Sequence, residues 1–195
     1  VLVYRSEVLD EDLTVAGPLT ARLWVSTTAG DADWVVKLID VYPDGRSMLV
    51  LDGAVQARYR ESNEHGVLME PGTIYEFTID LWATSIVFNS GHRIRLAITS
   101  SNYPRFEKNP NTGAPFAEWN ETMVADNVIY SGVSHPSGIV LPLAGPDTDG
   151  DGLYTFTNLP SGNYSISVDT TSLPPGAVQT YDLDDGFGAS DNQAS

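Results

Sequence analysis

Residues 19–26 read LTARLWVS, and apolar side chains alternate with polar or bulky ones along the whole stretch. Leu19, Ala21, Leu23 and Val25 point to one side of an extended chain, and the residues between them point to the other. A period of two is typical of a strand that has one buried face. The stretch therefore predicts a β-strand whose sheet packs against a core.

The same alternation recurs in two further stretches, YEFTIDLW from Tyr75 and RIRLAITS from Arg93. Turn-forming sequences separate such stretches, namely YPDG at 42–45, EPG at 70–72, NSG at 89–91 and NPNTG at 109–113. No segment keeps the spacing of an amphipathic helix for more than about two turns. Many short strands joined by turns predict an all-β fold, an antiparallel sandwich of jelly-roll or immunoglobulin-like type.

The net charge of −16 is unevenly distributed along the 195 residues. Residues 1–146 hold ten basic and 18 acidic side chains, whereas residues 147–195 hold eight acidic side chains and no basic one, so each part has a net charge of −8. Bound cations, a basic partner or a salt-adapted surface would each account for such acidity. Nucleic acid is excluded as a partner because no basic patch is evident. No apolar stretch approaches the roughly 20 residues of a membrane span, and the absence of cysteine excludes disulfides.

Residues 1–143 resemble a known module over nearly their whole length. The resemblance lies in the segments 3–27, 33–62, 71–113 and 128–143, which include YPDGRSMLVLDG, YEFTIDLWATS and SSNYPRFEKNPNTG. They are similar to the C-terminal domain of the X-prolyl dipeptidyl-peptidase and cocaine esterase (CocE/NonD) hydrolases. The resemblance implies a galactose-binding-like jelly roll, non-catalytic itself, that packs against an α/β-hydrolase domain.

The chemistry of a serine hydrolase is not evident in the sequence. A nucleophile elbow requires G-x-S-x-G, which does not occur here. His65, His92 and His135 cannot be paired with a serine or carboxylate by spacing, so each is interpreted as structural or solvated. Asp31 and Asp33 are interpreted as solvated loop charges. The sequence therefore predicts a chain that is not an enzyme.

The stretch 100–119, SSNYPRFEKNPNTGAPFAEW, predicts a loop longer than structureless connections usually are. Aromatic and arginine side chains concentrate binding energy at protein interfaces. This loop offers Tyr103, Arg105, Phe106, Phe116 and Trp119 as interface residues. The alternatives are that these side chains close the end of the sandwich, or, by analogy of fold alone, that they bind carbohydrate.

Residues 147–152 read DTDGDG, which places Asp147, Asp149 and Asp151 at positions 1, 3 and 5 of an oxygen-rich calcium loop with glycine at position 6. Position 12 is Asn158 instead of glutamate, and the flanking sequences favour strands, so an EF-hand is not expected. Calcium is nevertheless a candidate cofactor, with Asp182, Asp184 and Asp185 as further ligands. A solvated turn is the alternative interpretation.

Residues 147–195 resemble the latter part of a B-type repeat of serine-aspartate-repeat surface proteins, through DGLYTFTNLPSGNY at 151–164. The resemblance implies a partial immunoglobulin-like sandwich after a joint at 144–146. Its three expected strands, 153–156, 163–168 and 178–183, are too few for a complete sandwich. Such a sheet invites strand addition, either to the edge of the jelly roll in the same chain or, the preferred alternative, to a neighbouring chain.

The function expected from the sequence is that of an accessory module of a secreted, hydrolase-like protein, located outside the cell or on its surface. Its expected partners are the α/β-hydrolase domain of the parent protein or further copies of itself. A subunit of an extracellular filament or surface layer and a carbohydrate-binding module are the alternatives.

Overall fold

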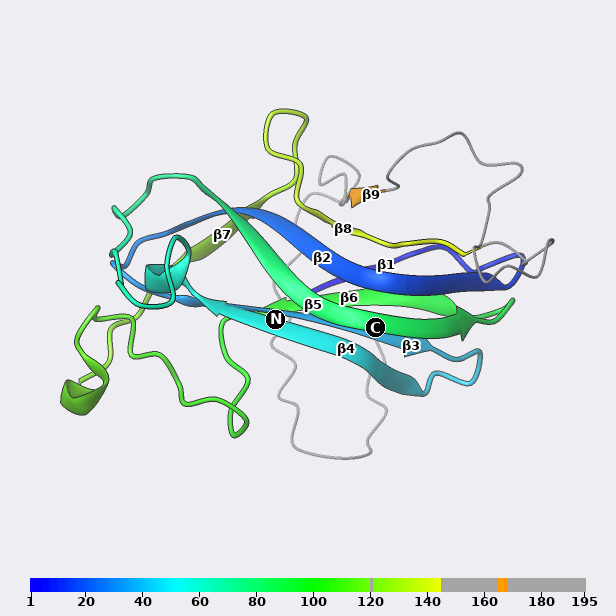
Figure 1. Ribbon diagram of the computed structural model, residues 1–195, viewed down its shortest axis with the longest axis horizontal. Helices are drawn as coiled ribbons and strands as arrows, with labels where there is room; N and C mark the ends of the chain where they lie inside the picture. Colours follow the sequence, from blue (N-terminus) through cyan, green and yellow to red (C-terminus); the bar gives the residue numbers. More distant parts are fainter. Residues whose placement is uncertain (120, 145–164, 168–195) are drawn as a thin grey trace, which may run out of the picture.

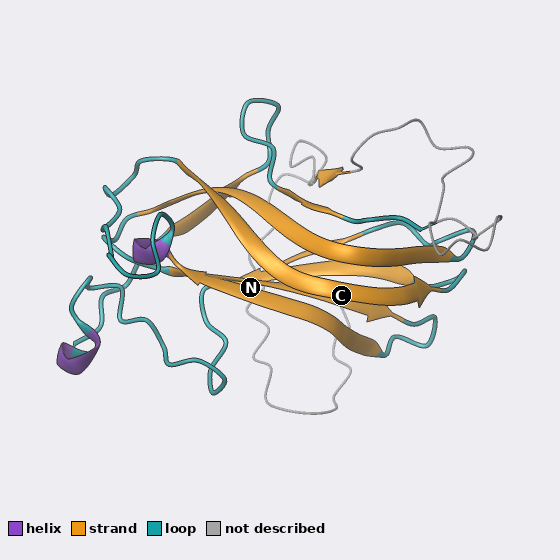
Figure 2. Cartoon of the chain, viewed as in Figure 1, coloured by secondary structure: helices purple, strands orange, loops and turns teal. Residues whose placement is uncertain are grey.

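The computed structural model describes residues 1–119, 121–144 and 165–167. Over these residues the chain is almost entirely strand and loop (Figure 2). The strands are β1 (Leu2–Arg5), β2 (Leu13–Thr27), β3 (Asp33–Val41), β4 (Ser47–Gln56), β5 (Tyr75–Phe88), β6 (Arg93–Thr99), β7 (Asn127–Tyr130), β8 (Gly138–Val140) and β9 (Ser165–Ser167). Two single-turn 3₁₀ helices, η1 (Ala57–Tyr59) and η2 (Phe116–Glu118), lie in loops.

The strands form two sheets with antiparallel pairing throughout (Figure 1). Sheet A has the order β1-β6-β3-β4, and sheet B has the order β5-β2-β8-β9, with β7 also paired to β2. The all-β antiparallel architecture predicted from the sequence is confirmed. This strand order is compatible with the expected jelly roll, and the immunoglobulin-like part lies almost wholly outside the described residues.

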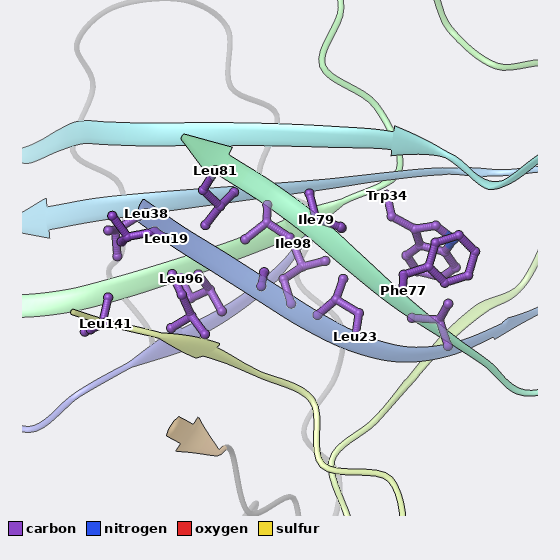
Figure 3. Packing of buried hydrophobic residues seen from close by; sticks show 14 of the residues in the cluster. Leu19, Leu23, Trp34, Leu38, Phe77, Ile79, Leu81, Leu96, Ile98 and Leu141 are labelled. Atoms are coloured by element: carbon purple, nitrogen blue, oxygen red, sulfur yellow. The ribbon is translucent and has the colours of Figure 1, made fainter. Parts of the chain in front are cut away.

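The core lies between the two sheets and contains the apolar residues that the alternating sequence pattern predicts to be buried (Figure 3). Leu19, Ala21, Leu23 and Val25 of β2 are fully buried, as predicted. The inward residues of β5 and β6 are also buried, namely Phe77, Ile79, Leu81, Ile94, Leu96 and Ile98. The four predicted turns are confirmed as well, and each contains a glycine with positive φ: Gly45, Gly72, Gly91 and Gly113.

A β-bulge interrupts the pairing of β2 and β5. Pro18 lies opposite Ala83 and Thr20 lies opposite Asp80, so that β5 has one residue more than β2 between these pairs. Trp82 occupies the bulge with φ of 68°, and its N–H donates a 2.8 Å hydrogen bond to the Asp80 carboxylate. The bulge turns the Trp82 side chain outward, where it is exposed.

The two sheets approach each other most closely where β4 crosses β5. A Cβ atom on Gly53 would lie 2.4 Å from the backbone oxygen of Asp80 and 2.8 Å from Leu81 Cδ2. Only glycine fits here, because the nearest obstacle is main chain and cannot rotate away. Gly53 thus allows β4 and β5, the edge strands of the two sheets, to lie in close contact.

We expect Gly53→Ala to lower the free energy of unfolding by about 1–3 kcal/mol, as overpacking of a core does. Chemical denaturation at pH 7 measures this difference. Gly132→Ala is the matched control, because a Cβ atom there meets nothing within 4 Å. Equal midpoints for the two variants would show that β4 and β5 are not in close contact.

The short strand β9 lies within the predicted strand 163–168 and pairs with β8 of the same chain, with Ile166 opposite Ile139. Of the two forms of strand addition expected from the sequence, this pairing corresponds to addition within one chain. The other two strands expected after residue 146, at 153–156 and 178–183, lie outside the described residues. No helix in the described part of the chain has the length and apolar character needed to cross a membrane.

Candidate interaction site

The loop 100–119 follows β6 and lies at one end of the sandwich, where both 3₁₀ helices also lie (Figure 2). Its first part is held against the outer side of β4. Asn102 donates a 3.1 Å hydrogen bond to the Asp52 carboxylate, and the Arg105 guanidinium forms an ion pair with the same group. The loop is therefore fastened to sheet A at its start.

A buried polar cluster fastens the middle of the loop. The carboxylate of Asp31 is fully buried and accepts hydrogen bonds from Arg58 Nε at 2.8 Å, Gln56 Nε2 at 2.7 Å and Asn109 Nδ2 at 3.1 Å. Arg58 Nη2 in turn donates to the Ala114 carbonyl at 3.1 Å. Because buried charges are stable only when they are paired and hydrogen-bonded, this cluster sets the position of the loop relative to β3 and β4.

The prediction that Asp31 and Asp33 are solvated loop charges is wrong. Asp31 is fully buried, and Asp33 is half-buried beside it and accepts a 2.8 Å hydrogen bond from Asn109. Their partners lie 25 to 78 positions away in the sequence, so the local pattern contained no sign of the pairing. Burial, and to a lesser extent the nearby Asp31 charge, raises the pKa of the Asp33 carboxyl to about 6.

This raised pKa predicts a pH-dependent stability. The folded chain binds the Asp33 proton more tightly than the unfolded chain does, so the contribution of Asp33 to the free energy of unfolding falls as pH rises from about 4 to about 6. We expect Asp33→Asn to remove this fall in stability, because the asparagine side chain does not ionise. The variant side chain can still accept the hydrogen bond from Asn109. Denaturation at pH 4 and pH 7 measures the free energy of unfolding of both proteins, and the variant should be more stable relative to the wild type at pH 7 than at pH 4. The same difference in the free energy of unfolding at both pH values would contradict the raised pKa of Asp33.

The outer side of the loop remains open to solvent. Tyr103 is 58% exposed, Phe106 44% and Phe116 69%, which is high for aromatic residues. Phe116 packs on Trp119 with ring centroids 4.9 Å apart, and Trp119 Nε1 donates to the Ala114 carbonyl at 3.0 Å. The Arg105 guanidinium lies 5.3 Å from the centre of the Phe106 ring. The five predicted interface residues are therefore grouped on one loop, with three aromatic rings exposed.

Neighbouring loops extend this exposed apolar area. Residues 57–74 run beside the loop, since Gly113 lies against Leu68 and Arg58 contacts Ala114. Met123 N–H donates to the Pro110 carbonyl at 2.8 Å, which brings residues 121–126 to the same end. We call this region the apolar end surface; its exposed residues are Val67, Leu68, Tyr103, Phe106, Phe116 and Met123. Exposed apolar patches of this kind are typical of interaction sites.

His92 is buried and contacts side chains that have a structural role. His92 Nδ1 donates to the Asp40 carboxylate at 2.9 Å, and its ring packs on Tyr42 with centroids 4.3 Å apart. Spacing alone did not predict this carboxylate partner. In the described residues no hydroxyl is hydrogen-bonded to His92. His135 is half-buried, its Nδ1 lies 3.1 Å from the hydroxyl of its neighbour Ser134, and its ring packs on Trp24 with centroids 4.9 Å apart. The pair of Asp40 and His92 links β3 to the turn before β6.

The predicted calcium ligands Asp147, Asp149, Asp151, Asp182, Asp184 and Asp185 lie outside the described residues. Within residues 1–119, 121–144 and 165–167, no three or more histidine, aspartate or glutamate side chains are grouped to hold a metal ion. The candidate site that the structure describes is the apolar end surface, with Arg105 beside it.

The two antiparallel sheets, with exposed aromatic side chains at one end, define a β-sandwich domain. Residues 1–140 match the family of the X-Pro dipeptidyl-peptidase C-terminal non-catalytic domain. The chain belongs to this family.

Related proteins share the same region. The cocaine esterase of Rhodococcus sp. is 48% identical over 145 residues, which are 73% of this chain and 25% of that protein. An aminopeptidase from a marine sediment Thaumarchaeota archaeon has a TM-score of 0.71 at 34% identity, over 74% of this chain and 26% of that one. An α-amino acid ester hydrolase has a TM-score of 0.70 at 33% identity, over 73% of this chain and 25% of that one. The chain therefore spans about a quarter of the length of these relatives.

Proposed function

We propose that this domain packs against an α/β-hydrolase domain of the same protein through the apolar end surface and stabilises it. The domain is the non-catalytic C-terminal part of a CocE/NonD-type hydrolase, and the relatives that contain it are about four times longer. The observation that carries the proposal is the exposure of Tyr103, Phe106 and Phe116 on a loop that is fastened from within. A preorganised aromatic surface loses little conformational entropy on binding.

The direction of the chain supports this choice of surface. Leu2 pairs with Ile98 near the end of β6, and the loop 100–119 begins directly after that strand. The start of β1 therefore lies beside the start of the loop (Figure 1). A domain that precedes β1 in the same protein would therefore enter close to the apolar end surface.

The proposal includes an extracellular or cell-surface location. Its support is the resemblance of residues 147–195 to the repeats of surface proteins. The proposal concerns packing and stability, and it assigns the hydrolytic chemistry to the preceding domain.

Binding to a hydrolase domain tests the interface. The hydrolase part of the Rhodococcus cocaine esterase, without its C-terminal quarter, is a suitable partner because its own C-terminal part is 48% identical to this chain. The double variant Phe106→Ser/Phe116→Ser should weaken binding about 30-fold or more, equivalent to about 2 kcal/mol for loss of an aromatic hot spot. Isothermal titration calorimetry measures the dissociation constants.

The matched control is Val133→Ser, a fully exposed apolar residue in the loop between β7 and β8. This variant should bind like the wild type. If both variants bind equally well, the interface lies elsewhere on the domain.

A further inference from the structure

Trp82 has a backbone conformation that tryptophan rarely adopts. Its φ of 68° lies in the left-handed region, which bulky side chains avoid because Cβ crowds the backbone there. The Asp80 carboxylate stabilises this conformation by accepting the 2.8 Å hydrogen bond from the Trp82 N–H. Trp82 is also 73% exposed, whereas the other three tryptophans of the chain are buried or half-buried. The fold thus holds one large apolar side chain in solvent despite the backbone strain.

The bulge at Trp82 divides the outer face of sheet B into two parts. Before the bulge, Arg22 and Glu76 form an ion pair at 3.0 Å on that face. After the bulge, three adjacent segments contain no charged residue, in a chain in which 18% of residues are charged. These segments are 13–21, 81–88 and 138–144. Exposed sheet faces and edges usually carry charges that prevent association, so the uncharged part favours contact with another domain.

The strand register shows which residues of this part point outward. Val15, Ile86 and Phe88 point into the core, so their neighbours along β2 and β5 point to the outer face. The outward pairs are Thr14 with Val87, Ala16 with Ser85 and Pro18 with Ala83. We call these six residues, with Trp82 at their border, the uncharged face. Its β5 residues are all exposed, and Val87 is 43% exposed.

The composition of the uncharged face is that of the centre of a protein interface, where charged residues are depleted and tryptophan is enriched. The relatives indicate what occupies it. About three quarters of the length of the Rhodococcus cocaine esterase lies outside the region that this chain matches. Under the function proposed above, the partner is therefore a hydrolase domain larger than this one, which can contact more than one side of the sandwich.

Strand β5 connects the uncharged face to the apolar end surface (Figure 1). It begins directly after the loop 57–74, where the Tyr75 hydroxyl accepts a 3.1 Å hydrogen bond from the Glu70 N–H. Trp82 lies about 23 Å further along the strand, at about 3.3 Å per residue. An interface of standard size covers about 800 Å² on each partner and is about 30 Å across. One partner can therefore cover both surfaces.

We propose that the uncharged face, with Trp82, is a second contact between this domain and the α/β-hydrolase domain of the same protein. This inference rests on the proposed function and adds the chemistry of the partner surface. The surface that fits is uncharged and apolar, with a depression that receives the indole ring of Trp82. The strained backbone then has a role, because it holds the indole in place before binding and little conformational entropy is lost on contact.

Replacement of Trp82 by glycine separates a role in binding from a role in folding. Glycine adopts a positive φ without strain, so Trp82→Gly should leave the unfolding midpoint of the chain unchanged or raise it. The same variant should bind the hydrolase part of the cocaine esterase about 30-fold more weakly, as for loss of a tryptophan hot spot. Chemical denaturation and isothermal titration calorimetry measure the two quantities. Val133→Gly, at a fully exposed apolar residue outside the uncharged face, is the matched control and should bind like the wild type.

A charge placed within the uncharged face provides a second test. Ser85→Glu should weaken binding about 10-fold or more, because the contact would bury an unpaired carboxylate. Thr78→Glu is its control, since Thr78 is exposed on the same side of β5 before the bulge, opposite Arg22. This control should bind like the wild type. Equal binding by Trp82→Gly and the wild type would overturn the proposal. Weaker binding by Trp82→Gly that accompanies a lower unfolding midpoint, while Ser85→Glu binds normally, would also overturn it.

The same titrations distinguish the two surfaces. If only Phe106→Ser/Phe116→Ser weakens binding, the apolar end surface is the interface and the uncharged face is not covered. If only Trp82→Gly and Ser85→Glu weaken binding, the uncharged face is the interface and the apolar end surface is not. Absence of binding by the wild type would contradict both. Light scattering of the chain alone should show a monomer, and a dimer that Trp82→Gly dissociates would overturn the proposal, because the occupant would then be a second copy.

Discussion

Asp31→Ala should lower the free energy of unfolding by about 3–5 kcal/mol, the effect typical of breaking a buried ion pair. The change removes the acceptor for Arg58 Nε, Gln56 Nε2 and Asn109 Nδ2 and leaves the Arg58 guanidinium buried without its counter-charge. Denaturation at pH 7 measures the loss. The same variant should raise hydrogen exchange in the loop 100–119, because the cluster holds the middle of that loop.

Asp44→Ala is the control for this prediction. Asp44 forms a 2.7 Å ion pair with Arg46, but both side chains lie in an exposed turn. Exposed pairs contribute little to stability, so this variant should change the unfolding midpoint far less. A loss for Asp31→Ala no larger than that for Asp44→Ala would contradict the importance of the buried cluster.

Phe77→Ala should have a comparable effect, a loss of about 3–5 kcal/mol in the free energy of unfolding. Phe77 of β5 is buried between the sheets and lies with its ring centroid 6.3 Å from that of Trp34 of β3 (Figure 3). Removal of the ring leaves a cavity that rigid strands on both sides cannot fill. Thr78→Ala, the next residue on the exposed side of β5, should change stability by no more than about 0.5 kcal/mol. Similar losses for both variants would mean that the buried face of β5 was assigned wrongly.

The sequence allowed the core to be predicted because burial in a sandwich follows a local rule. Leu19 and Phe77 could be placed inside from the period of two alone, and both are buried. The turns could be predicted for a similar reason, since Gly45 and Gly91 have the positive φ that few other residues adopt. Such features depend on a few consecutive residues.

Features that depend on distant residues could not be predicted in this way. Asp31 is buried because Arg58 and Asn109 reach it from other segments, and a carboxylate without those partners would remain in solvent. The contact between Asp40 and His92 has the same origin. The close approach at Gly53 depends on how two sheets cross, and the outward turn of Trp82 depends on one extra residue in the pairing of β5 with β2.

The candidate interface was partly accessible from sequence. The aromatic and arginine residues of 100–119 were visible as a group, and the resemblance indicated a hydrolase domain as partner. The contribution of Val67 and Leu68 to the same surface was not visible, because the loop 57–74 reaches that end only through the fold. The pairing of Arg5 with Arg95 was hidden for the same reason, since these residues are 90 positions apart and meet only by strand pairing.

Ester turnover is the most direct test of the claim that this chain is a non-catalytic module that stabilises a hydrolase domain. Turnover would be measured for the chain alone, for the hydrolase part of the cocaine esterase alone, and for their mixture, after incubation at increasing temperature. We expect no turnover by the chain alone and survival of the hydrolase activity to higher temperature in the mixture. The Phe106→Ser/Phe116→Ser variant should give less protection. Turnover by the chain alone that a serine-directed inhibitor abolishes, or equal protection by the wild type and the double variant, would contradict the account.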